Sequence, residues 1–282
     1  MNAAVTVFFL IIKVFSLYFL AVSLFGLCSR RRPEPAARLR RFAVLIAARN
    51  EESCIAGLIE SLWAQHYPPE LVDIWVLPNN CTDRTAEAAR RAGAQVLEMP
   101  ASVRSKGAAL HTAAKALLRS ARNYDAFCVF DADNEADPAF LSEMNRALDR
   151  TAIVKSRILA KNRTQAGISA CYEIYFCSAN HFLNRAREAV GLSARVIGTG
   201  FAIRRDLLEA LDGFPCRTLT EDAELYAACL CRGARIGYCE TAVTYDEEPV
   251  TWRASLVQRR RWMSGILQVA RLTLPELLAN FL

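Results

Sequence analysis

The sequence lacks the short motifs that identify several common classes of protein. No G-x-G-x-x-G or G-K-[S/T] loop is present, so any phosphate that binds would have to be neutralised by other means, such as a metal ion and basic side chains. None of the ten cysteines forms a C-x-x-C pair, and several lie in apolar runs such as AFCVF. This usage indicates reduced, buried thiols in a reducing compartment rather than a disulfide framework or a zinc site. The three histidines belong to no motif.

Positive charge is not arranged in one long stripe either. The basic residues behind the net charge of +6 cluster at 30–41 and 259–261, each beside an apolar stretch. No aromatic platform is interleaved with them, so no nucleic-acid partner is expected. Basic clusters beside apolar helices favour anionic lipid or a diphosphate as the partner.

Apolar residues are concentrated near the N-terminus. The run 5–27 is long enough to cross a hydrocarbon core of about 30 Å as a helix, and it carries one charge, Lys13, whose side chain can snorkel. Arg30, Arg31 and Arg32 follow this run, whereas a cleaved signal peptide has its basic residues in front. The positive-inside rule then predicts that the rest of the chain lies in the cytoplasm. A buried or interfacial helix is the alternative.

Beyond the basic linker, short apolar runs alternate with helix-period segments, which is typical of a mostly parallel sheet covered by helices. No repeat or low-complexity tract interrupts this pattern. We predict strands at 42–48, 73–77, 95–99 and 126–130, with helices between them at 51–66, 84–92 and 106–120. A helix at 164–188, strands at 197–203 and 235–238, and a long basic helix from about residue 251 complete the prediction.

Polar side chains follow three of these strands. In open α/β sheets ligands bind beyond the carboxyl ends of the strands, so the three ends should meet in one crevice. They carry Arg49, Asn50 and Glu51, then Asn79, Asn80 and Asp83, then Asp131 and Asp133. Two carboxylates directly after a buried strand can share a hard divalent cation whose other positions take diphosphate oxygens and water. An aspartate there is also a common turn former, so this pair alone leaves both interpretations open.

Two further polar segments lie downstream. T-E-D at 220–222 precedes a helix-like run, where an acidic helix N-terminus is the alternative to a catalytic role. Q-R-R-R-W at 258–262 lies on a basic amphipathic helix, where the alternative is a membrane-surface patch.

In this order the motifs resemble glycosyltransferase family 2, the group of the cellulose, chitin and hyaluronan synthases and the nodulation N-acetylglucosaminyltransferases. They are AARNEE, NNCTDRTAEAA, SKGAAL, DADN, GTGFAIRR, TED and QRRRW, and the matching stretch runs from about residue 42 to 265. The resemblance implies an α/β protein of GT-A fold, with a Rossmann-like nucleotide-sugar-binding mixed sheet flanked by helices. It also implies a UDP-sugar donor, a Mg²⁺ or Mn²⁺ ion and inversion at the anomeric carbon.

The resemblance also implies roles for the acidic motifs. Asp131 and Asp133 look like the carboxylates for metal and diphosphate, with Asp133 the better candidate for direct metal contact. Asp222 looks like the general base, and Glu221 beside it is expected to help raise its pKa.

The other motifs match substrate-binding positions of the family. Arg261 resembles the guanidinium that stabilises the leaving diphosphate, and Trp262 resembles the flat wall against which a sugar ring lies. The remaining expected substrate-binding residues are Arg49, Asn50, Glu51, Asn79, Asn80 and Asp83 around uridine, Lys106 at the donor phosphates, Gly198, Thr199 and Gly200 beside the acceptor, and Gln258 on the motif helix.

The sequence departs from the family pattern in two places. Family members usually carry an aspartate early in the second strand-end turn, where this chain has Asn79 and Asn80, which can still hydrogen-bond a base edge. Processive members continue beyond the QRRRW motif into several transmembrane helices, whereas this sequence continues only with MSGILQVARLTLPELLANFL. We therefore expect a non-processive enzyme, a membrane channel partner contributed by another protein, or a shortened chain.

Together these features predict a metal-dependent, inverting hexosyltransferase at the cytoplasmic face of a bilayer. The resemblance implies that it transfers glucose or N-acetylglucosamine from a UDP-sugar to a saccharide or lipid-linked acceptor and forms a β-linkage. The expected parts are a membrane-spanning helix at 1–29, a basic juxtamembrane linker at 30–41, a GT-A catalytic domain at 42–250 and an amphipathic interfacial helix at 251–282. A non-catalytic, membrane-tethered nucleotide-sugar-binding subunit or sensor is the alternative, although such a module needs no base such as Asp222. A nucleotidyltransferase is disfavoured because the chain has a QRRRW motif and no phosphate loop.

Overall fold

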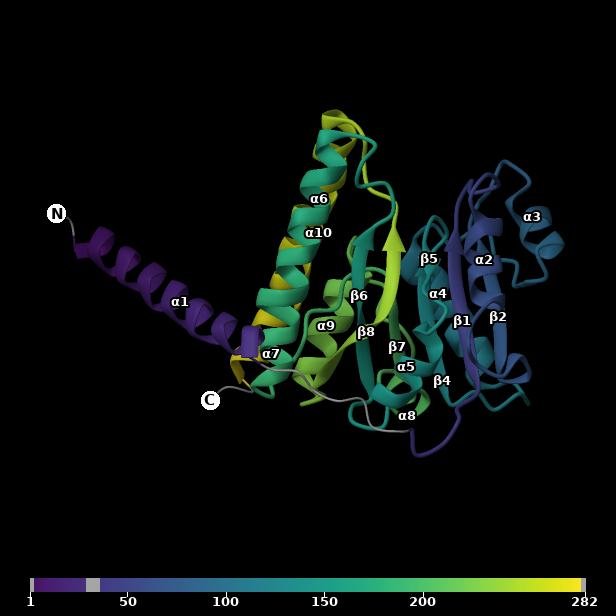
Figure 1. The fold of residues 1–282 in the computed structure, drawn as a ribbon, viewed down its shortest axis with the longest axis horizontal. Coiled ribbons are helices and arrows are strands. Elements are labelled where there is room, and N and C mark those ends of the chain that lie inside the picture. The colour runs from purple at the N-terminus through teal and green to yellow at the C-terminus, as the bar shows by residue number, and fades with distance from the viewer. Residues whose placement is uncertain (1–2, 29–35, 280–282) are drawn as a thin grey trace.

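The computed structural model describes residues 3–28 and 36–279, and an eight-stranded mixed sheet runs through its body (Figure 1). The strand order is β3-β2-β1-β4-β7-β6-β8-β5. The strands are β1 (Phe42–Ala48), β2 (Val72–Pro78), β3 (Gln95–Val96), β4 (Ala126–Asp131), β5 (Glu135–Ala136), β6 (Ile153–Ala160), β7 (Phe201–Arg204) and β8 (Ile236–Asp246). The α-helices are α1 (Ala3–Cys28), α2 (Ile55–Trp63), α3 (Thr85–Arg91), α4 (Lys106–Leu118), α5 (Phe140–Ala147), α6 (Gly167–Ser178), α7 (Ala186–Ala189), α8 (Arg205–Ala210), α9 (Glu221–Cys231) and α10 (Trp252–Ala279). A 3₁₀ turn, η1 (Pro69–Leu71), precedes β2, and a π-helix, η2 (Ala179–Arg185), joins α6 to α7.

The N-terminal half of the sheet is parallel, as the alternating pattern predicts. β1 pairs in parallel with β2 and β4, and its side chains are almost all buried because helices cover both faces of the sheet. Successive residues point to opposite faces, so Val44 and Ile46 join one core cluster while Ala43 and Leu45 join the other. This arrangement places the carboxyl ends of β1, β2 and β4 at one edge.

The C-terminal half departs from the parallel interpretation. β7 runs antiparallel to both β4 and β6, and β5 runs antiparallel to β8, so the sheet is mixed, as the resemblance implies. β6 was not predicted, because its sequence IVKSRILA interrupts the apolar run with Lys155 and Arg157. The strand predicted at 197–203 begins only at Phe201, since the glycine-rich segment before it forms a turn.

A helical layer lies at the far end of the sheet. The helix predicted at 164–188 is divided into α6, η2 and α7, and α6 runs alongside α10 (Figure 1). A small third core cluster of Ile158, Tyr172 and Phe176, with Trp262 packed against it, joins α6 and α10 to the sheet. The predicted basic helix is therefore attached to the body through α6, and it also packs against α9 and the residues before it, where the amide of Leu219 donates to Gln268 Oε1 at 3.0 Å.

Helix α1 projects from the body on the side of α6 and α10 (Figure 1). Its segment Val5–Gly26 is the one part of the described residues that is long and apolar enough to cross a membrane, and apart from Gly26 at its end no residue of the segment is buried in the protein. The end near the body is fastened to η2, because Ser23 Oγ donates to the carbonyl of Phe182 at 3.0 Å. Gly26 fits closely there, since an added Cβ would lie 2.7 Å from the carbonyl oxygen of His181. Arg30 to Arg32, on which the predicted orientation depends, lie outside the described residues.

Candidate active site

The three polar strand ends meet at one edge of the sheet, as predicted. Ala47 of β1 pairs with Asp131 of β4, and the amide of Asn79 donates to the carbonyl of Ala48 at 2.9 Å. The side chain of Asn50 accepts from the amide of Thr82 at 2.8 Å and so joins the first turn to the second. The residues after β1, β2 and β4 therefore form one continuous rim.

Several residues expected around uridine also build this rim. Asn50 and Asn80 both have positive φ, which asparagine tolerates well. Asn80 donates to the carbonyl of Val103 and to the side chain of Asn79, which is itself buried. Asp83 holds the start of α3, and its hydrogen bond from the Thr85 hydroxyl lowers the pKa of its carboxyl.

The two residues at the mouth of the rim are less constrained. Arg49 is exposed. Glu51 is half-buried, and its carboxylate accepts from the thiol of Cys54 at 3.1 Å. These two side chains, unlike Asn79, can turn toward a ligand without breaking the turns that position them.

Lys106 lies at the centre of the site. Its Nζ is 2.6 Å from Asp131 Oδ1 and 3.2 Å from Glu221 Oε1, and it donates to the carbonyl of Gly198 at 2.6 Å. Burial alone would lower the pKa of this lysine, but the carboxylates of Asp131 and Glu221 raise it well above its usual range. The lysine is therefore a fixed positive charge that joins α4, β4, α9 and the segment before β7.

Asp222 lies beside the same segment, and its Oδ2 would be 4.0 Å from a Cβ on Gly198. Its Oδ2 accepts a hydrogen bond from the amide of Gly198 at 2.8 Å, which orients the carboxylate. Burial raises the pKa of the neighbouring Glu221, with the charge of Lys106 opposing this and that of Asp222 adding to it. The two acids of the T-E-D motif therefore have different partners. Glu221 forms an ion pair with Lys106, and Asp222 accepts a hydrogen bond from the backbone.

The segment 198–200 contributes differently at each position. A Cβ on Gly198 would lie 3.7 Å from Lys106 Nζ and 3.8 Å from Asp131 Oδ2, so this glycine faces the charged cluster. Thr199 is buried, and its hydroxyl accepts from the amide of Asp131 at 3.0 Å. Gly200 has φ +59° and faces the sheet, where Ser156 and Thr244 fill the space around it. Only Gly198 of the three lies where an acceptor would approach the backbone.

This packing predicts a large effect of Gly200→Ala on stability. The added Cβ would lie 2.5 Å from the hydroxyls of Ser156 and Thr244, at a backbone angle that alanine rarely adopts. We expect a loss of about 1–3 kcal/mol, typical of overpacking, measured as a lower melting temperature. Gly57→Ala is the control, because no atom lies within 4 Å of its added Cβ. Equal melting temperatures for the two variants would contradict this account.

A chain of amides and carboxylates continues behind Asp131. Asn134 Nδ2 donates to Asp246 Oδ1 at 2.7 Å and to Asp133 Oδ1 at 3.3 Å, and the Thr199 hydroxyl donates to Asn134 Oδ1. Burial raises the pKa of Asp133 to about 8, and the charges of Asp246 and Asp131 add to this. Burial and Asp131 likewise raise the pKa of Asp246 to about 7. This corner of the site therefore has a shortage of positive charge.

These carboxylates fit a hard divalent cation. Their oxygens are the ligands that Mg²⁺ and Mn²⁺ accept, and their mutual repulsion is what a bound cation would relieve. Within residues 3–28 and 36–279, no group of three or more His, Cys, Asp or Glu side chains is arranged to hold a metal by itself. That finding suits an ion bound by one or two carboxylates together with substrate phosphates.

Three charged residues of the site escaped the sequence analysis. Asp246 and Glu248 come from the acidic run YDEE at the end of β8, and Lys155 lies within β6. Burial raises the pKa of Glu248 to about 9, with Asp246 and Asp133 adding to it. An acidic run directly after an apolar strand is the signal that could have identified the first two. Lys155 gave no such signal, since a strand lysine usually points to solvent.

The burial of Lys155 predicts that the stability of the protein depends on pH. Burial lowers its pKa to about 7, against the opposing charge of Asp246, whereas an unfolded lysine titrates near 10.4. Between these values the unfolded chain binds a proton that the folded protein does not, so stability should rise with pH, by up to about 1.4 kcal/mol per pH unit. We expect Lys155→Met to flatten the rise in melting temperature between pH 7.5 and 9.5. Lys161→Met should leave it unchanged, because Lys161 pairs with Glu135 near the surface. Parallel curves for wild type and Lys155→Met would rule this account out.

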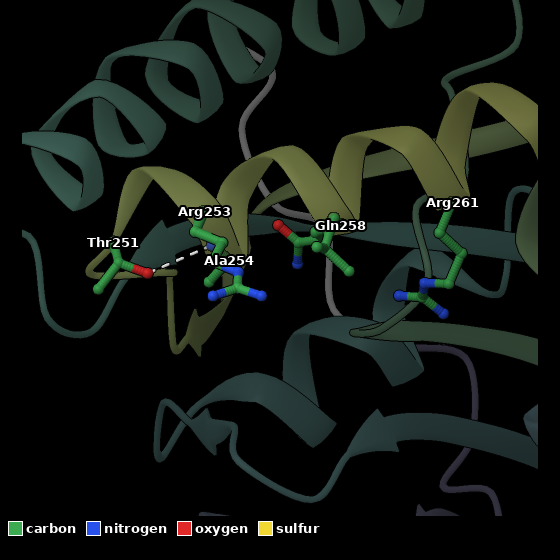
Figure 2. Close-up of a pocket in the computed structure, with 6 residues that line it drawn as sticks. Thr251, Arg253, Ala254, Gln258 and Arg261 are labelled. Atoms are coloured by element: carbon green, nitrogen blue, oxygen red, sulfur yellow. Dashed lines mark hydrogen bonds between the residues drawn. The ribbon is translucent and has the colours of Figure 1, made fainter.

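The QRRRW motif lies on α10, where Tyr172 of α6 fixes its orientation. The Tyr172 hydroxyl donates to Gln258 Oε1 at 2.9 Å, and its ring lies edge-on to Trp262 with 6.3 Å between centroids. Arg261 is exposed and lines a groove of about 530 Å³ along α10 (Figure 2). Gln258 contacts Tyr172 and also lines the groove, whereas Trp262 packs mainly against α6.

Solved structures share this architecture. A mannosyltransferase from Pyrobaculum calidifontis, in complex with GDP-Man and Mn²⁺, aligns with 90% of this chain and 71% of its own at a TM-score of 0.69 and 20% identity. Glucosyl-3-phosphoglycerate synthase from Mycobacterium tuberculosis, in complex with Mn²⁺, UDP and glucosyl-3-phosphoglycerate, aligns with 86% of both chains at a TM-score of 0.57 and 21% identity. The mixed sheet and its flanking helices therefore define a protein of GT-A fold, the fold of these glycosyltransferases.

Residues 40–265 match the family described as "Glycosyltransferase like family 2", so the chain belongs to this family of glycosyltransferases. A probable glycosyltransferase of Bacillus subtilis, YdaM, is 28% identical over 82% of this chain and 56% of its own length. A beta-monoglucosyldiacylglycerol synthase of Synechocystis is 26% identical over 79% of this chain and 47% of its own. The chain thus spans about half the length of these curated relatives.

Proposed function

We propose that the protein is a metal-dependent, inverting hexosyltransferase that uses a UDP-sugar, with glucose or N-acetylglucosamine as the sugar. The observation that carries this proposal is the convergence of Asp131, Lys106 and Asp222 on Gly198, described above. Lys106 Nζ, Asp131 Oδ2 and Asp222 Oδ2 would all lie within 4.0 Å of a Cβ on Gly198, so a charge pair suited to a diphosphate and a carboxylate oriented by the backbone face the same space. A donor whose diphosphate lies toward Asp131 and Asp133 would expose its anomeric carbon to an acceptor beside Asp222.

Transfer would then be a single displacement. Asp222 accepts the proton of the acceptor hydroxyl while that oxygen bonds to the anomeric carbon. The bond from this carbon to the diphosphate oxygen breaks, and an α-linked donor gives a β-linked product. Lys106 and Arg261 supply positive charge to the departing diphosphate. Asp131 and Asp133 would hold a Mg²⁺ or Mn²⁺ ion, which supplies Lewis-acid stabilisation of the leaving group.

The donor and acceptor are proposed from chemistry together with the relatives. The compared structures hold GDP-Man in one case and UDP in the other, so sugars of both nucleotides should be tested. The name of the Synechocystis relative supports a glucosyl donor and a lipid acceptor, and the family resemblance keeps a saccharide as the other acceptor class. The proposed uridine contacts are Arg49 and Glu51, with the surrounding asparagines shaping the rim.

We place the site at the cytoplasmic face of a bilayer. Besides α1, the exposed face of α10 supports this placement: Trp252, Leu256, Met263, Leu267, Leu274 and Leu278 are each at least half exposed. Members of this series recur eleven residues apart, as in Trp252, Met263 and Leu274. Eleven residues complete three turns at 3.67 residues per turn, so the stripe stays on one side of the helix. A straight apolar stripe flanked by arginines suits a helix that lies in a membrane surface.

Nucleotide release from the purified, detergent-solubilised full chain tests the proposal. UDP-sugars and GDP-sugars would be screened with Mn²⁺, Mg²⁺ or EDTA, with and without lipid and saccharide acceptors. Release from one donor that depends on the metal supports the proposal and identifies the sugar. Binding of a nucleotide sugar without release, under every acceptor condition, would favour a non-catalytic binding subunit.

A further inference from the structure

The groove along α10 presents an unusual set of polar groups. It is lined by Thr251, directly before α10, and by Arg253, Ala254, Val257, Gln258 and Arg261 from the first turns of the helix. Figure 2 shows the side chains of Arg253, Gln258 and Arg261 on one side of the helix, with the two arginines at opposite ends. Both are exposed, and no ion pair of either occurs among the described residues. The groove is therefore positively charged and has no carboxylate in its lining.

Tyr172 determines which end of the Gln258 amide reaches the groove. The tyrosine hydroxyl has one proton, which it donates to Gln258 Oε1, so the hydroxyl of Ser255 must donate to Tyr172 across their 3.0 Å contact. With its oxygen occupied, Gln258 offers the N–H groups of its amide to the groove. Tyr172 and Ser255 are both buried, so solvent does not compete for this arrangement.

Consequently the side chains of the groove offer mainly hydrogen-bond donors. Thr251 Oγ1 already accepts from the amide of Ala254 at 3.2 Å and can still donate its own proton. Together with the amide of Gln258 and two guanidinium groups, it faces a ligand that must supply acceptor oxygens and negative charge. A phosphate group meets both requirements, whereas a neutral sugar would also need acceptors for its hydroxyl protons.

One diphosphate does not account for both arginines. Arg253 and Arg261 are eight residues apart, which separates their Cα atoms by about 12 Å along the helix. If Arg261 contacts the leaving diphosphate, as proposed above, Arg253 at the other end is left for a second anion. A groove of about 530 Å³ has room for a further group of that size.

The surroundings indicate where the second anion comes from. Val257, 66% exposed, lies between the arginines, and Leu256 of the apolar stripe is three residues after Arg253, so these two side chains are neighbours on the helix surface. A molecule with its phosphate at Arg253 can therefore keep an apolar tail against the stripe. We propose that the groove binds the acceptor and that this acceptor is an anionic phospholipid with a free hydroxyl on its head group. This proposal rests on the proposed function and names the acceptor class of the same site.

Binding can be tested separately from catalysis. Isothermal titration of dihexanoyl phosphatidylglycerol into the full-length Asp222→Asn protein measures affinity without turnover. We expect Arg253→Gln to weaken binding about 10-fold, as for the loss of a charge-assisted hydrogen bond, and Arg253→Lys to weaken it less. Arg271→Gln is the matched control, an exposed arginine on α10 outside the groove. Equal losses in Arg253→Gln and Arg271→Gln would mean general attraction between charges, and would overturn the proposal.

Tyr172→Phe tests the orientation of the amide. It keeps the ring but frees Gln258 Oε1, so we expect weaker binding of the same lipid, whereas Tyr175→Phe, at a partly exposed position of α6, should bind like the parent. Unchanged binding in Tyr172→Phe would overturn the role given to this residue.

Transfer assays then separate the sources of the phosphate. Labelled sugar should enter phosphatidylglycerol in phosphatidylcholine vesicles, and not diacylglycerol in the same vesicles or soluble glycerol phosphate. Transfer only to diacylglycerol would overturn the phosphate requirement, and transfer only to glycerol phosphate would overturn the lipid. Metal-dependent nucleotide release with no lipid product would overturn this acceptor while leaving the proposed function intact.

Discussion

Replacing Asp222 by asparagine is expected to lower the rate of sugar transfer by about 10³-fold, within the range for loss of a general base. Asparagine keeps the size of the side chain, and its Oδ1 can still accept from the amide of Gly198. The variant should therefore fold normally and bind the donor nucleotide as the wild type does, but it has no group to accept the proton of the acceptor. Single-turnover transfer and nucleotide affinity, measured on the same preparation, separate these effects.

Asp206→Asn is the control for this experiment. Asp206 is an exposed acid that pairs with Arg204 far from the site, so its variant should transfer sugar at the normal rate. A residual rate in Asp222→Asn within about threefold of the wild type would exclude this carboxylate as the base. Loss of nucleotide affinity in the same variant would instead assign Asp222 to donor binding.

The second large effect is expected at Asp133. Asp133→Asn should abolish stimulation by Mn²⁺ and lower transfer by at least about 10²-fold, because the amide cannot neutralise a divalent cation. The raised pKa of Asp133, about 8, also sets the dependence on pH. Below this value a cation must displace a proton, so the affinity for Mn²⁺ in the wild type should increase from pH 6 to pH 8.5.

The increase in melting temperature on adding Mn²⁺ measures this binding without turnover. It should grow with pH in the wild type and be small at every pH in Asp133→Asn. Asp212→Asn is the control, since Asp212 is a highly exposed acid paired with Lys115, and asparagine tolerates its positive φ. Full stabilisation of Asp133→Asn by Mn²⁺ would place the ion elsewhere.

Much of the site was predictable because parallel strands bring their carboxyl ends to one edge. Apolar runs defined β1, β2 and β4, so the residues that follow them, including Asp131, had to meet. The mixed half was harder to predict. β6 contains a lysine and an arginine whose neighbours in the fold are distant in sequence. No local sequence pattern predicts that a strand such as β7 pairs in antiparallel orientation.

Local sequence likewise could not assign each motif residue its contacts. Gln258, Arg261 and Trp262 were expected to act together on substrate. The contact with Tyr172, 86 residues away from Gln258, and the packing of α10 against α9 fix the rotation of α10, so only part of the motif faces the groove. Gly200 was expected beside the acceptor, but its missing Cβ is required by Ser156 and Thr244 of neighbouring strands.

The sequence by itself determined the order of the elements, the residues at the strand ends and the apolar character of α1, because hydrophobic periodicity and turn chemistry act over a few residues. The tertiary structure alone decided how these groups are charged and where they point. It buried Lys155, brought the charge of Asp246 near Asp133, bound Glu221 to Lys106 and left Asp222 oriented by a backbone amide. Burial and long-range charge depend on neighbours that only the folded chain brings together.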